Sequence, residues 1–397
     1  MNNEVDVSKL TFEQLKKVRG YLKKLIDNGG SDLHVKANAV MRARINGNIM
    51  QFSGVVFSKE DAITFAKELL KGRYSEFVEK KELDLVYPFD DENRFRVNIF
   101  FQMEGVSAVF RVIPVEIPTF EELKLPEVLK TFAQKERGLV LVTGVTGSGK
   151  STTLAALINE INLHKKKHII TIEDPIEFVH KDRGCLINQR SVGQDTLSFG
   201  TALRAALRED PDIILVGEMR DKETINLALH AADTGHLVFS TLHTVDAKET
   251  INRIIAQFPT DEQNRVRLGV AGVLQGVISQ RLVPTKDGGR RVAMEILVRT
   301  PRIEKLIMEN RDYEIKDAIE SGREHYKSQS FDQSILELYN DGIITKEQAF
   351  ENATSPADLE LKINGLTSGG AADVKPSESK NEYENQVIAD DDIFDLK

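Results

Sequence analysis

The strongest constraint on the fold of this chain is a glycine-rich loop between a predicted strand and a predicted helix. The compact apolar run Gly138–Thr143 favours a strand, and residues 150–163 favour a helix. The loop between them reads Gly144-Val-Thr-Gly-Ser-Gly-Lys-Ser151. A strand, a glycine loop and a helix in this order begin a β-α unit of a parallel sheet. The segment therefore predicts an α/β domain.

Further strands are predicted beyond this loop. Short apolar runs at residues 168–172, 213–216 and 237–241 are separated by helical patterns. Strands that alternate with helices form mostly parallel sheets with helices on both faces. From residue 261 to about 364 helical patterns dominate, apart from one predicted strand at 291–298. We therefore expect the α/β domain to be followed by a helical C-terminal region.

The first hundred residues have a different pattern, which predicts an α+β domain. Helices are expected over about residues 12–27, where Asn28-Gly29-Gly30 supplies a stop, and near 59–80. The remaining predicted elements are strands at 33–35, 40–50 with an Asn46-Gly47 hairpin turn, 94–101 and 105–113. Pro114, Pro118 and Pro126 then favour a stiff connector between two domains.

These patterns divide the chain into five segments. They are an N-terminal α+β domain at 1–113, a linker at 114–126, an α/β core at 127–299, a helical region at 300–365 and an acidic tail at 366–397. From Ser368 onward the tail has eight acidic and three basic residues and few apolar ones, so we expect it to be disordered. Its end, Asp390-Asp-Asp-Ile-Phe-Asp-Leu, fits a solubilising tail or a docking peptide.

Composition argues against several classes of protein. The net charge of −9 argues against binding of nucleic acid over an extended surface, so no direct nucleic-acid partner is expected. No apolar run approaches the roughly 18 residues of a membrane span, and the polar start is unlike a signal peptide. We therefore expect a cytoplasmic protein. Its single cysteine, Cys185, excludes an internal disulfide and is expected to be a small buried residue.

The glycine loop has the residues that a nucleotide phosphate site requires. Backbone N–H groups can close around a phosphate where glycines leave room, and the following helix directs its positive end at the anion. Lys150 is expected to reach the β- and γ-phosphates of ATP, and the Ser151 hydroxyl to bind Mg²⁺. The predicted nucleotide-binding residues are Gly144, Thr146, Gly147, Ser148, Gly149, Lys150, Ser151 and Thr152.

Acidic residues follow two of the predicted strands. Glu218 comes just after the run 213–216, where P-loop proteins place a carboxylate towards Mg²⁺ and the attacking water, so it is predicted as a metal residue with Ser151. Glu173, Asp174 and Glu177 follow the preceding strand and could polarise water. Taken alone, such a cluster also fits a solvated loop.

Three histidines, His230, His236 and His243, flank the predicted strand at 237–241. They lack the spacing of metal ligands and have no cysteine partners, which argues against zinc. A sensor of the γ-phosphate or a plain structural role remains for them.

Four segments together resemble the functional boxes of secretion ATPases. Residues 144–151, 171–180, 209–221 and 234–244 resemble the Walker A motif, Asp box, Walker B motif and His box, in that order. The similarity runs from about Asp32-Leu-His to Ile363, and Leu207-Arg-Glu-Asp-Pro-Asp-Ile-Ile-Leu-Val-Gly-Glu-Met-Arg-Asp221 is highly specific. The chain is thereby identified as a member of the type IV pilus retraction ATPase family, or PilT family.

The resemblance implies a PAS-like N-terminal domain joined to a RecA-like P-loop ATPase domain. It makes Glu177 the leading general base and Glu218 the acid that serves metal and water, with Glu173 in support. It makes His236 and His243 the His-box residues.

The resemblance also implies roles for the N-terminal domain and for assembly. Arg96 and Arg111 match segments that supply arginine sensors to ATP, where a cationic pair stabilises charge on the γ-phosphate. The family forms homohexameric rings that convert ATP-driven domain closure into work on an inner-membrane pilus platform protein. The chain would then lie at the inner face of the inner membrane and drive pilus retraction and twitching motility, with a paralogous retraction ATPase as a further partner.

Some features separate the chain from related motors. Assembly and type II secretion ATPases usually carry a tetracysteine zinc element and a longer N-terminal extension, whereas this chain has one cysteine. The C-terminal element of principal retraction motors aligns with Arg302-Ile-Glu-Lys-Leu-Ile-Met-Glu309, which loses both arginines of that element. Residues 314–319 and 329–339 resemble the accessory, PilU-like subgroup. Principal and accessory retraction motors therefore both remain open.

Two other classes of function stay as alternatives. A DNA-transfer motor shares the phosphate loop, but the acidic charge of the chain argues against it. An ATP-binding regulator without turnover is disfavoured by the paired carboxylates and arginines.

Overall fold

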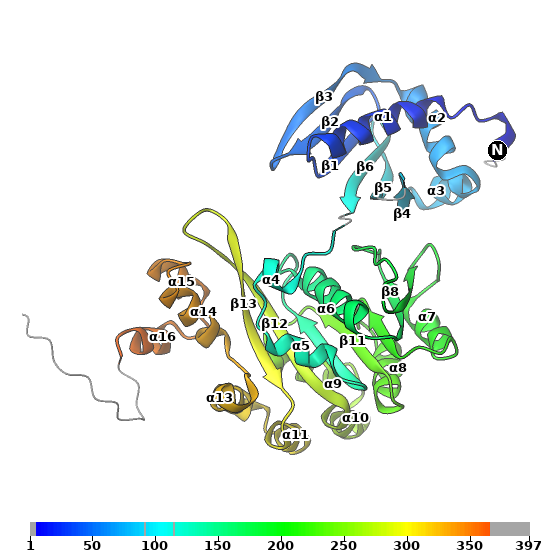
Figure 1. Ribbon diagram of the computed structural model, residues 1–397. Coiled ribbons are helices and arrows are strands. Elements are labelled where there is room, and N and C mark those ends of the chain that lie inside the picture. Colours follow the sequence, from blue (N-terminus) through cyan, green and yellow to red (C-terminus); the bar gives the residue numbers. More distant parts are fainter. Residues whose placement is uncertain (1–4, 91–92, 114–115, 366–397) are drawn as a thin grey trace, which may run out of the picture.

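The structure, a computed structural model, describes residues 5–90, 93–113 and 116–365. It contains a six-stranded sheet formed before residue 114 and a seven-stranded sheet formed after residue 137 (Figure 1). Each sheet packs with its own helices around its own hydrophobic residues. The expected α/β fold is confirmed, and the predicted disordered tail lies outside the described residues.

The N-terminal sheet is antiparallel throughout. The elements of this part are α1 (Glu13–Asp27), β1 (Asp32–Lys36), β2 (Ala39–Ile45), β3 (Asn48–Phe57), α2 (Lys59–Leu70), α3 (Tyr74–Lys80), β4 (Glu82–Pro88), β5 (Arg94–Gln102) and β6 (Gly105–Ile113). The strand order is β3-β2-β1-β6-β5-β4. Leu22 and Leu25 of α1 and Phe65 of α2 are buried in one cluster with Phe110 of β6, so both helices cover the same core.

The structure confirms one turn prediction for this domain and corrects the prediction in two other places. The Asn46-Gly47 turn is confirmed, since both residues have positive φ and join Ile45 to Asn48. The helix expected at 59–80 is instead two helices, because Lys71 adopts φ 51° at the end of α2. Strand β4 was not predicted. It pairs with β5 at the edge of the sheet, and its residues are mostly part-exposed.

The proline-rich connector is partly ordered against the second domain. It includes α4 (Phe120–Leu123), which begins with a capping box formed by Thr119 and Glu122, and it is followed by α5 (Val128–Ala133). Phe120 and Leu125 are buried in the same cluster as residues of the second sheet. Residues 120–125 of the predicted linker therefore pack against the second domain.

The second sheet carries the glycine loop. Its strands are β7 (Gly138–Thr143), β8 (His168–Glu173), β9 (Leu186–Ser191), β10 (Ile213–Val216), β11 (Leu237–Leu242), β12 (Leu274–Pro284) and β13 (Arg290–Val298). The order is β13-β12-β7-β11-β10-β8-β9, and only β13 runs antiparallel to its neighbour. Strands β7, β10 and β11 are buried along their whole length. The prediction of a mostly parallel sheet is confirmed.

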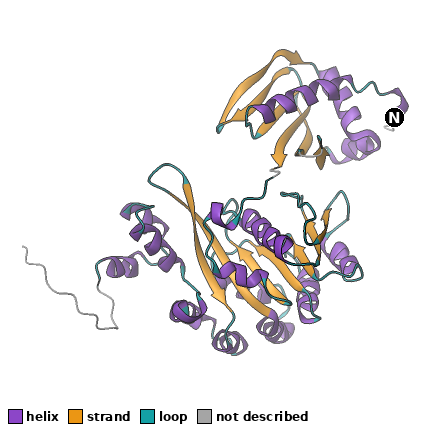
Figure 2. Ribbon diagram, viewed as in Figure 1, coloured by secondary structure: helices purple, strands orange, loops and turns teal. Residues whose placement is uncertain are grey.

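Helices cover both faces of this sheet (Figure 2). They are α6 (Lys150–His164), α7 (Phe199–Ala206), α8 (Lys222–Asp233), α9 (Ala247–Ala256) and α10 (Thr260–Val273). Val140 and Val142 of β7 pack with α5 and α6, while Leu139 and Leu141 pack with α7 to α10. This alternation along one strand is what a sheet with two covered faces requires.

Strand β12 corrects the prediction that helical patterns continue from residue 261. Helix α10 ends at Val273, and the chain then enters the sheet beside β7. A short run of apolar residues is compatible with either a buried helix or a buried strand, so periodicity did not separate the two. Gly276 allows the close packing, because a Cβ there would lie 2.3 Å from the Phe132 ring.

The C-terminal region is helical, as predicted. Its helices are α11 (Pro301–Met308), α12 (Ile315–Ser321), α13 (Arg323–Tyr326), α14 (Phe331–Asn340), α15 (Lys346–Asn352) and α16 (Pro356–Ile363). Helices α14 to α16 pack with β12 and β13 in a small separate cluster. In the part of the chain that the structure describes, no helix has the length and apolar character to cross a membrane.

Candidate functional site

The glycine loop follows β7 and ends at the first residue of α6. Gly144 has φ 138° and approaches β12 so closely that a Cβ would lie 2.5 Å from the carbonyl oxygen of Gln280. Gly149, with φ 91°, precedes the helix. Both positions therefore need glycine, and the loop can bring its N–H groups towards an anion at the N-terminus of α6.

A cavity of about 440 Å³ opens at this loop. Six of the eight predicted nucleotide-binding residues line it, namely Thr146, Gly147, Gly149, Lys150, Ser151 and Thr152. Gly144 and Ser148 do not line it, and Ser148 is buried behind the loop. The acidic residues Glu173, Glu177 and Glu218 line the same cavity with His243. The structure thus brings the predicted phosphate loop and the predicted carboxylates together.

Lys150 is one of the cationic residues that line the cavity. Its ammonium donates to the carbonyl oxygens of Gly144, at 2.9 Å, and Val145, at 3.1 Å. Burial lowers the pKa of Lys150, while the nearby charges of Glu218 and Glu177 act in the opposite direction. The two carboxylates therefore help to keep this ammonium charged in a site where burial disfavours charge.

Glu218 is held in place by its neighbours on both sides. The backbone N–H of Gly217 donates to the Ile172 carbonyl at 2.7 Å, and the Thr241 hydroxyl donates to the Gly217 carbonyl at 2.5 Å. The Glu218 carboxylate lies 2.7 Å from the Arg220 guanidinium and 3.4 Å from Nε2 of His243. These contacts fix an acid beside Lys150 and Ser151, where a metal-bound phosphate would lie.

Glu173 and Glu177 have different surroundings. Glu173 accepts hydrogen bonds from the Thr171 hydroxyl at 2.6 Å and from the Gln189 amide at 3.2 Å, and burial raises its pKa. Glu177 is exposed, and its backbone N–H lies 3.5 Å from the Glu173 carboxylate. Glu173 therefore orders the loop on which Glu177 projects, and Glu177 is the carboxylate of the pair that is free to meet water.

His236 is not at the cavity. It precedes β11, and its Nδ1 lies 2.9 Å from the Ala231 carbonyl oxygen at the end of α8. His243 follows the same strand. The two histidines are separated by six strand residues, which at about 3.3 Å each span roughly 20 Å, so they lie at opposite ends of β11. Within this chain, His236 does not line the cavity, because a whole strand separates it from the phosphate loop, and its catalytic role stays a prediction.

Arg96 and Arg111 do not line the cavity either. They face each other across β5 and β6, in a row that continues to Asp32 on β1 and Arg44 on β2. The buried Asp32 carboxylate lies 2.8 Å from Nε of Arg111, and this hydrogen bond helps to lower the pKa of Asp32 against the opposing effect of burial. Arg96 lies 4.0 Å from the exposed Asp84.

Several residues of the site were not predicted individually. Arg220 pairs with Glu218 and lies two residues beyond it, a spacing visible in the sequence. Beneath the glycine loop, the Thr143 hydroxyl donates to Ser279 at 2.9 Å and the Gln280 amide donates to Thr153 at 2.9 Å. A local sequence pattern does not predict these contacts, because β12 brings in Ser279 and Gln280 from far along the chain.

Glu295 of β13 is a buried acid next to the hydrogen bonds beneath the glycine loop. It pairs in register with Ser279, and its carboxylate accepts the backbone N–H of Ala247 at 2.8 Å, at the start of α9. Burial raises the pKa of Glu295 from 4.5 to about 7. The folded protein therefore holds a proton that the unfolded chain releases at lower pH.

Replacing Glu295 with glutamine is expected to stabilise the protein at pH 8 and to change little at pH 5. Between pH 4.5 and about 7 the folded state binds the extra proton, so stability falls as pH rises. A shift of this size corresponds to about 3 kcal/mol, and glutamine keeps the acceptor for Ala247 without the buried charge. Thermal unfolding midpoints at both pH values measure the effect, with exposed Glu324→Gln as control. Parallel pH curves for wild type and Glu295→Gln would contradict this assignment.

Known proteins match the chain in sequence and in structure. The family described as Type II/IV secretion system protein, T2SSE, matches residues 15–351. The type IV pilus retraction ATPase PilT of Pseudomonas aeruginosa is 47% identical over 332 residues, which are 83% of this chain and 96% of that protein. The type IV pilus ATPase PilU of the same organism is 40% identical over 389 residues, which are 96% of this chain and 98% of that protein.

A crystal structure of the pilus retraction motor PilT with bound ADP is similar in fold. It superimposes with a TM-score of 0.81 and 44% sequence identity, over 86% of this chain and 98% of that one. The family match over residues 15–351 includes every residue that lines the cavity described above. The chain therefore belongs to the type II/IV secretion system protein family and is a secretion ATPase.

Proposed function

We propose that this chain is a motor ATPase that powers the retraction of type IV pili. The observation that carries the proposal is the assembly of Lys150, Ser151, Glu177 and Glu218 around one cavity in a chain that matches almost the whole length of a retraction ATPase. The accessory variant of this function is the second candidate, because the match to PilU extends over 96% of the chain.

The residues at the cavity fit ATP with Mg²⁺. The Ser151 hydroxyl and the Glu218 carboxylate are oxygen ligands of the kind that Mg²⁺ prefers, and both line the cavity beside Lys150. Bound Mg²⁺ would neutralise part of the charge on the phosphates. Lys150 would contact the β- and γ-phosphates in place of the Gly144 and Val145 carbonyls that its ammonium contacts here.

The three carboxylates have different roles in the proposed hydrolysis. Glu177 projects into the cavity without a charged partner within salt-bridge distance in the described structure, so it is suited to accept a proton from water. Glu218 is fixed by Arg220 and His243 and serves the metal. Glu173, with its raised pKa, holds the loop of Glu177 and is a positioning residue.

The arginine row of the N-terminal domain would complete the site on domain closure. Arg111 is 65% exposed although Asp32 fixes its Nε, so its remaining N–H groups can reach a phosphate. We propose that residues 1–113 act as the closing unit over the ATPase core at 127–299, with 114–126 as the linker and 300–365 as the helical region. One direct contact already joins the two units, since the Val86 N–H donates to Gln194 at 3.2 Å.

Arg96→Ala and Arg111→Ala are expected to reduce ATP turnover by at least about tenfold, because a charge-assisted hydrogen bond contributes roughly 1.5 to 3 kcal/mol. Steady-state phosphate release measures this, and unfolding curves check the N-terminal fold. Arg96 is the cleaner test, since Arg111 also partners the buried Asp32. Exposed Arg42→Ala, outside the row, is the control. An ATP-bound structure with both guanidinium groups in solvent would contradict the role.

The proposed assembly follows the family resemblance. We propose a homohexameric ring that acts on an inner-membrane pilus platform protein, at the inner face of the inner membrane. A paralogous retraction ATPase is a further proposed partner. Sedimentation of the purified protein with and without nucleotide tests the ring directly.

Deletion of the gene is expected to leave pili on the cells. If the chain is the principal motor, cells should be hyperpiliated and unable to twitch, because extension continues while retraction has stopped. An accessory motor should give a milder defect, visible mainly under load. Pilus counts and twitching zones measure both, with wild-type and Lys150→Ala genes as complements. Loss of all surface pili, restored only by the wild-type gene, would show an assembly motor instead.

A further inference from the structure

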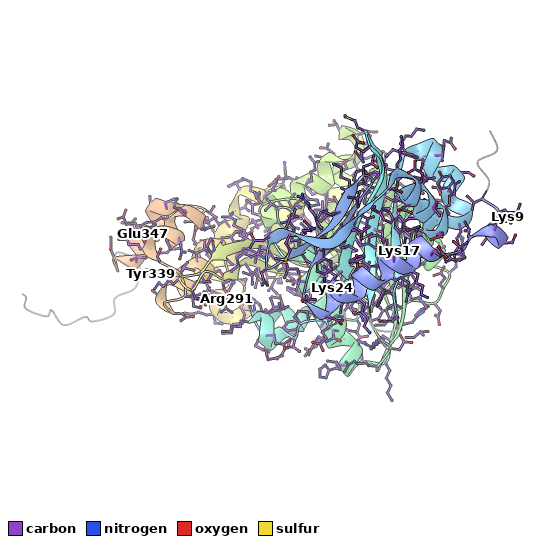
Figure 3. All side chains as sticks on the ribbon, turned by 90° about the horizontal axis from the view of Figure 1, so that it is seen from above. Lys9, Lys17, Lys24, Arg291, Tyr339 and Glu347 are labelled. Atoms are coloured by element: carbon purple, nitrogen blue, oxygen red, sulfur yellow. The ribbon has the colours of Figure 1, made fainter. Side chains whose placement is uncertain are left out.

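Helix α1 presents a row of lysines to the surface of the N-terminal domain. Lys16, Lys17, Lys23 and Lys24 are all exposed, and the two doublets are seven residues apart. Seven residues make about two helical turns, so the doublets share one side of the helix. Figure 3 shows Lys17 and Lys24 along α1 on the outer side of this domain. We call these four residues the lysine face.

Acidic side chains of the described structure leave the lysine face largely uncompensated. Elsewhere in the same domain, exposed lysines form ion pairs, as Lys80 does with Glu76 at 2.8 Å. In residues 5–90, 93–113 and 116–365, none of the four lysines forms an ion pair within 4 Å, and the Lys24 ammonium lies 4.6 Å from the Phe52 ring. Glu13 and Asp27 are exposed at the two ends of the helix, each one turn from a lysine doublet, so this side of α1 keeps a net positive charge without ion pairs within 4 Å.

Gly20 opens a shallow space between the doublets. It is exposed on the same side of α1, and a Cβ placed there would have no heavy atom within 4 Å. The helix surface is therefore bare at this point and flanked by ammonium groups at either end. Such a surface fits an acidic segment that also carries a bulky apolar side chain, which can cover the bare helix while its acids meet the lysines.

The C-terminal end of this chain has that composition. The whole chain is acidic, yet residues 1–113 contain 18 basic and 16 acidic residues, whereas residues 368–397 contain three basic and eight acidic ones. Four of those acids, Asp390, Asp391, Asp392 and Asp395, surround Ile393 and Phe394. The most acidic segment and the lysine face thus occur in one molecule with complementary charge.

We propose that the segment 390–395 docks on the lysine face of the same chain. The 24 residues between Gly365 and Asp390 allow the chain to span up to about 85 Å when extended. The segment can therefore reach the surfaces of its own chain that lie within this span of Gly365. A tether of this length also raises the local concentration of the segment towards the millimolar range, which a free partner seldom reaches.

The docking is electrostatic and therefore depends on salt. Exposed charges separated by more than about 10 Å are screened at 0.1 M salt, and higher salt weakens the remaining contacts. An anionic lipid surface or a nucleic acid could also use four lysines. Neither is tethered to the helix, and the tail is, so the tail is the occupant that the chain itself favours.

Disulfide trapping in the full chain tests this docking. Gly20→Cys places a thiol in the centre of the lysine face, and Lys397→Cys places one beside the acidic segment. Cys185 is buried and contributes little background. The matched control combines Gly269→Cys with Lys397→Cys, because Gly269 is also an exposed helical glycine with no heavy atom within 4 Å of an added Cβ. A disulfide requires Cα atoms within about 7 Å, so trapping reports contact.

We expect the Gly20 pair to form an intrachain disulfide at least about tenfold faster than the Gly269 pair at low salt. The difference should largely disappear at 0.5 M salt. Asp→Asn changes at the four tail acids, or Lys16→Glu with Lys17→Glu, should reduce the rate to the control level. Restoring opposite charges, by adding Asp390→Lys and Asp391→Lys to the glutamate variant, should recover it. Unchanged unfolding curves show that the variants fold.

Three results would overturn the proposal. Equal rates for the Gly20 and Gly269 pairs would remove the docking altogether. An interchain disulfide, seen as a doubled mass on a denaturing gel, would assign the face to a second copy of the chain. Control-level trapping together with binding of phosphatidylglycerol vesicles that is lost in Lys16→Glu, Lys17→Glu would assign it to a lipid surface.

Discussion

Replacing Lys150 with alanine should abolish ATP turnover and strongly weaken nucleotide binding. The ammonium lies at the N-terminus of α6, in the cavity that Glu177 and Glu218 also line. In the proposed site it is the cation that the phosphate loop would place over the β- and γ-phosphates, and alanine would leave that negative charge unmet in a partly buried site. Turnover should fall below detection in a phosphate-release assay, and titration with a fluorescent ATP analogue should show the loss of affinity.

The control for this variant must separate charge from folding. Lys150 donates to the Gly144 and Val145 carbonyls, so its removal also frees two acceptors of the loop. Lys166→Ala removes an exposed lysine from the region just beyond the other end of α6 and should leave turnover unchanged. Circular dichroism of both variants should match wild type. Normal hydrolysis by a folded Lys150→Ala protein would place the phosphate site elsewhere.

The features that the sequence predicted well are those set by local pattern. Strand β7 has the predicted bounds, and β10 coincides with an uninterrupted run of apolar residues that is too short for a typical helix. The glycine loop needs positive φ at Gly144 and Gly149, a local requirement that leaves a local signature. The cavity at the end of these elements was therefore predictable from the motif that joins them.

The features that it missed depend on contacts between distant segments. Strand β9 exposes several of its residues at the sheet edge, and only its pairing with β8 shows that it is a strand. Gln189 supports Glu173 because that pairing places it opposite Thr171. Ser279 and Gln280 support the glycine loop only because β12 enters the sheet. Periodicity reports which face of an element is buried and not which element covers it.

The histidines show how closeness in sequence can mislead. His236 and His243 belong to one box, but a strand runs between them, and only the residue at its carboxyl end reaches the cavity. In open α/β sheets, ligands bind outside the carboxyl ends of the strands. Glu173 is the last residue of β8, and Glu218 and His243 come just after β10 and β11. That rule, applied to the predicted strand at 237–241, separates the two histidines without a structure.

The identity of the general base should be decided by two isosteric variants, Glu177→Gln and Glu218→Gln. Glutamine keeps the shape of each side chain and removes the negative charge, so both proteins should still bind ATP. A positioned base contributes about 10²- to 10⁴-fold, and we expect at least about a 10²-fold loss of turnover in each variant. Exposed Glu79→Gln serves as the control.

The two variants should fail for different reasons, which distinguishes their roles. Glu218 lies within reach of Arg220 and His243, and its loss should raise the Mg²⁺ concentration needed for half-maximal activity. Glu177 has no such partner in the described structure, so its loss should lower kcat at saturating Mg²⁺ with little change in that requirement. If Glu177→Gln keeps nearly wild-type turnover, the base must be Glu173 or Glu218. The hydrogen bonds that Glu173 accepts from Thr171 and Gln189 would then favour Glu218, because they occupy the Glu173 carboxylate.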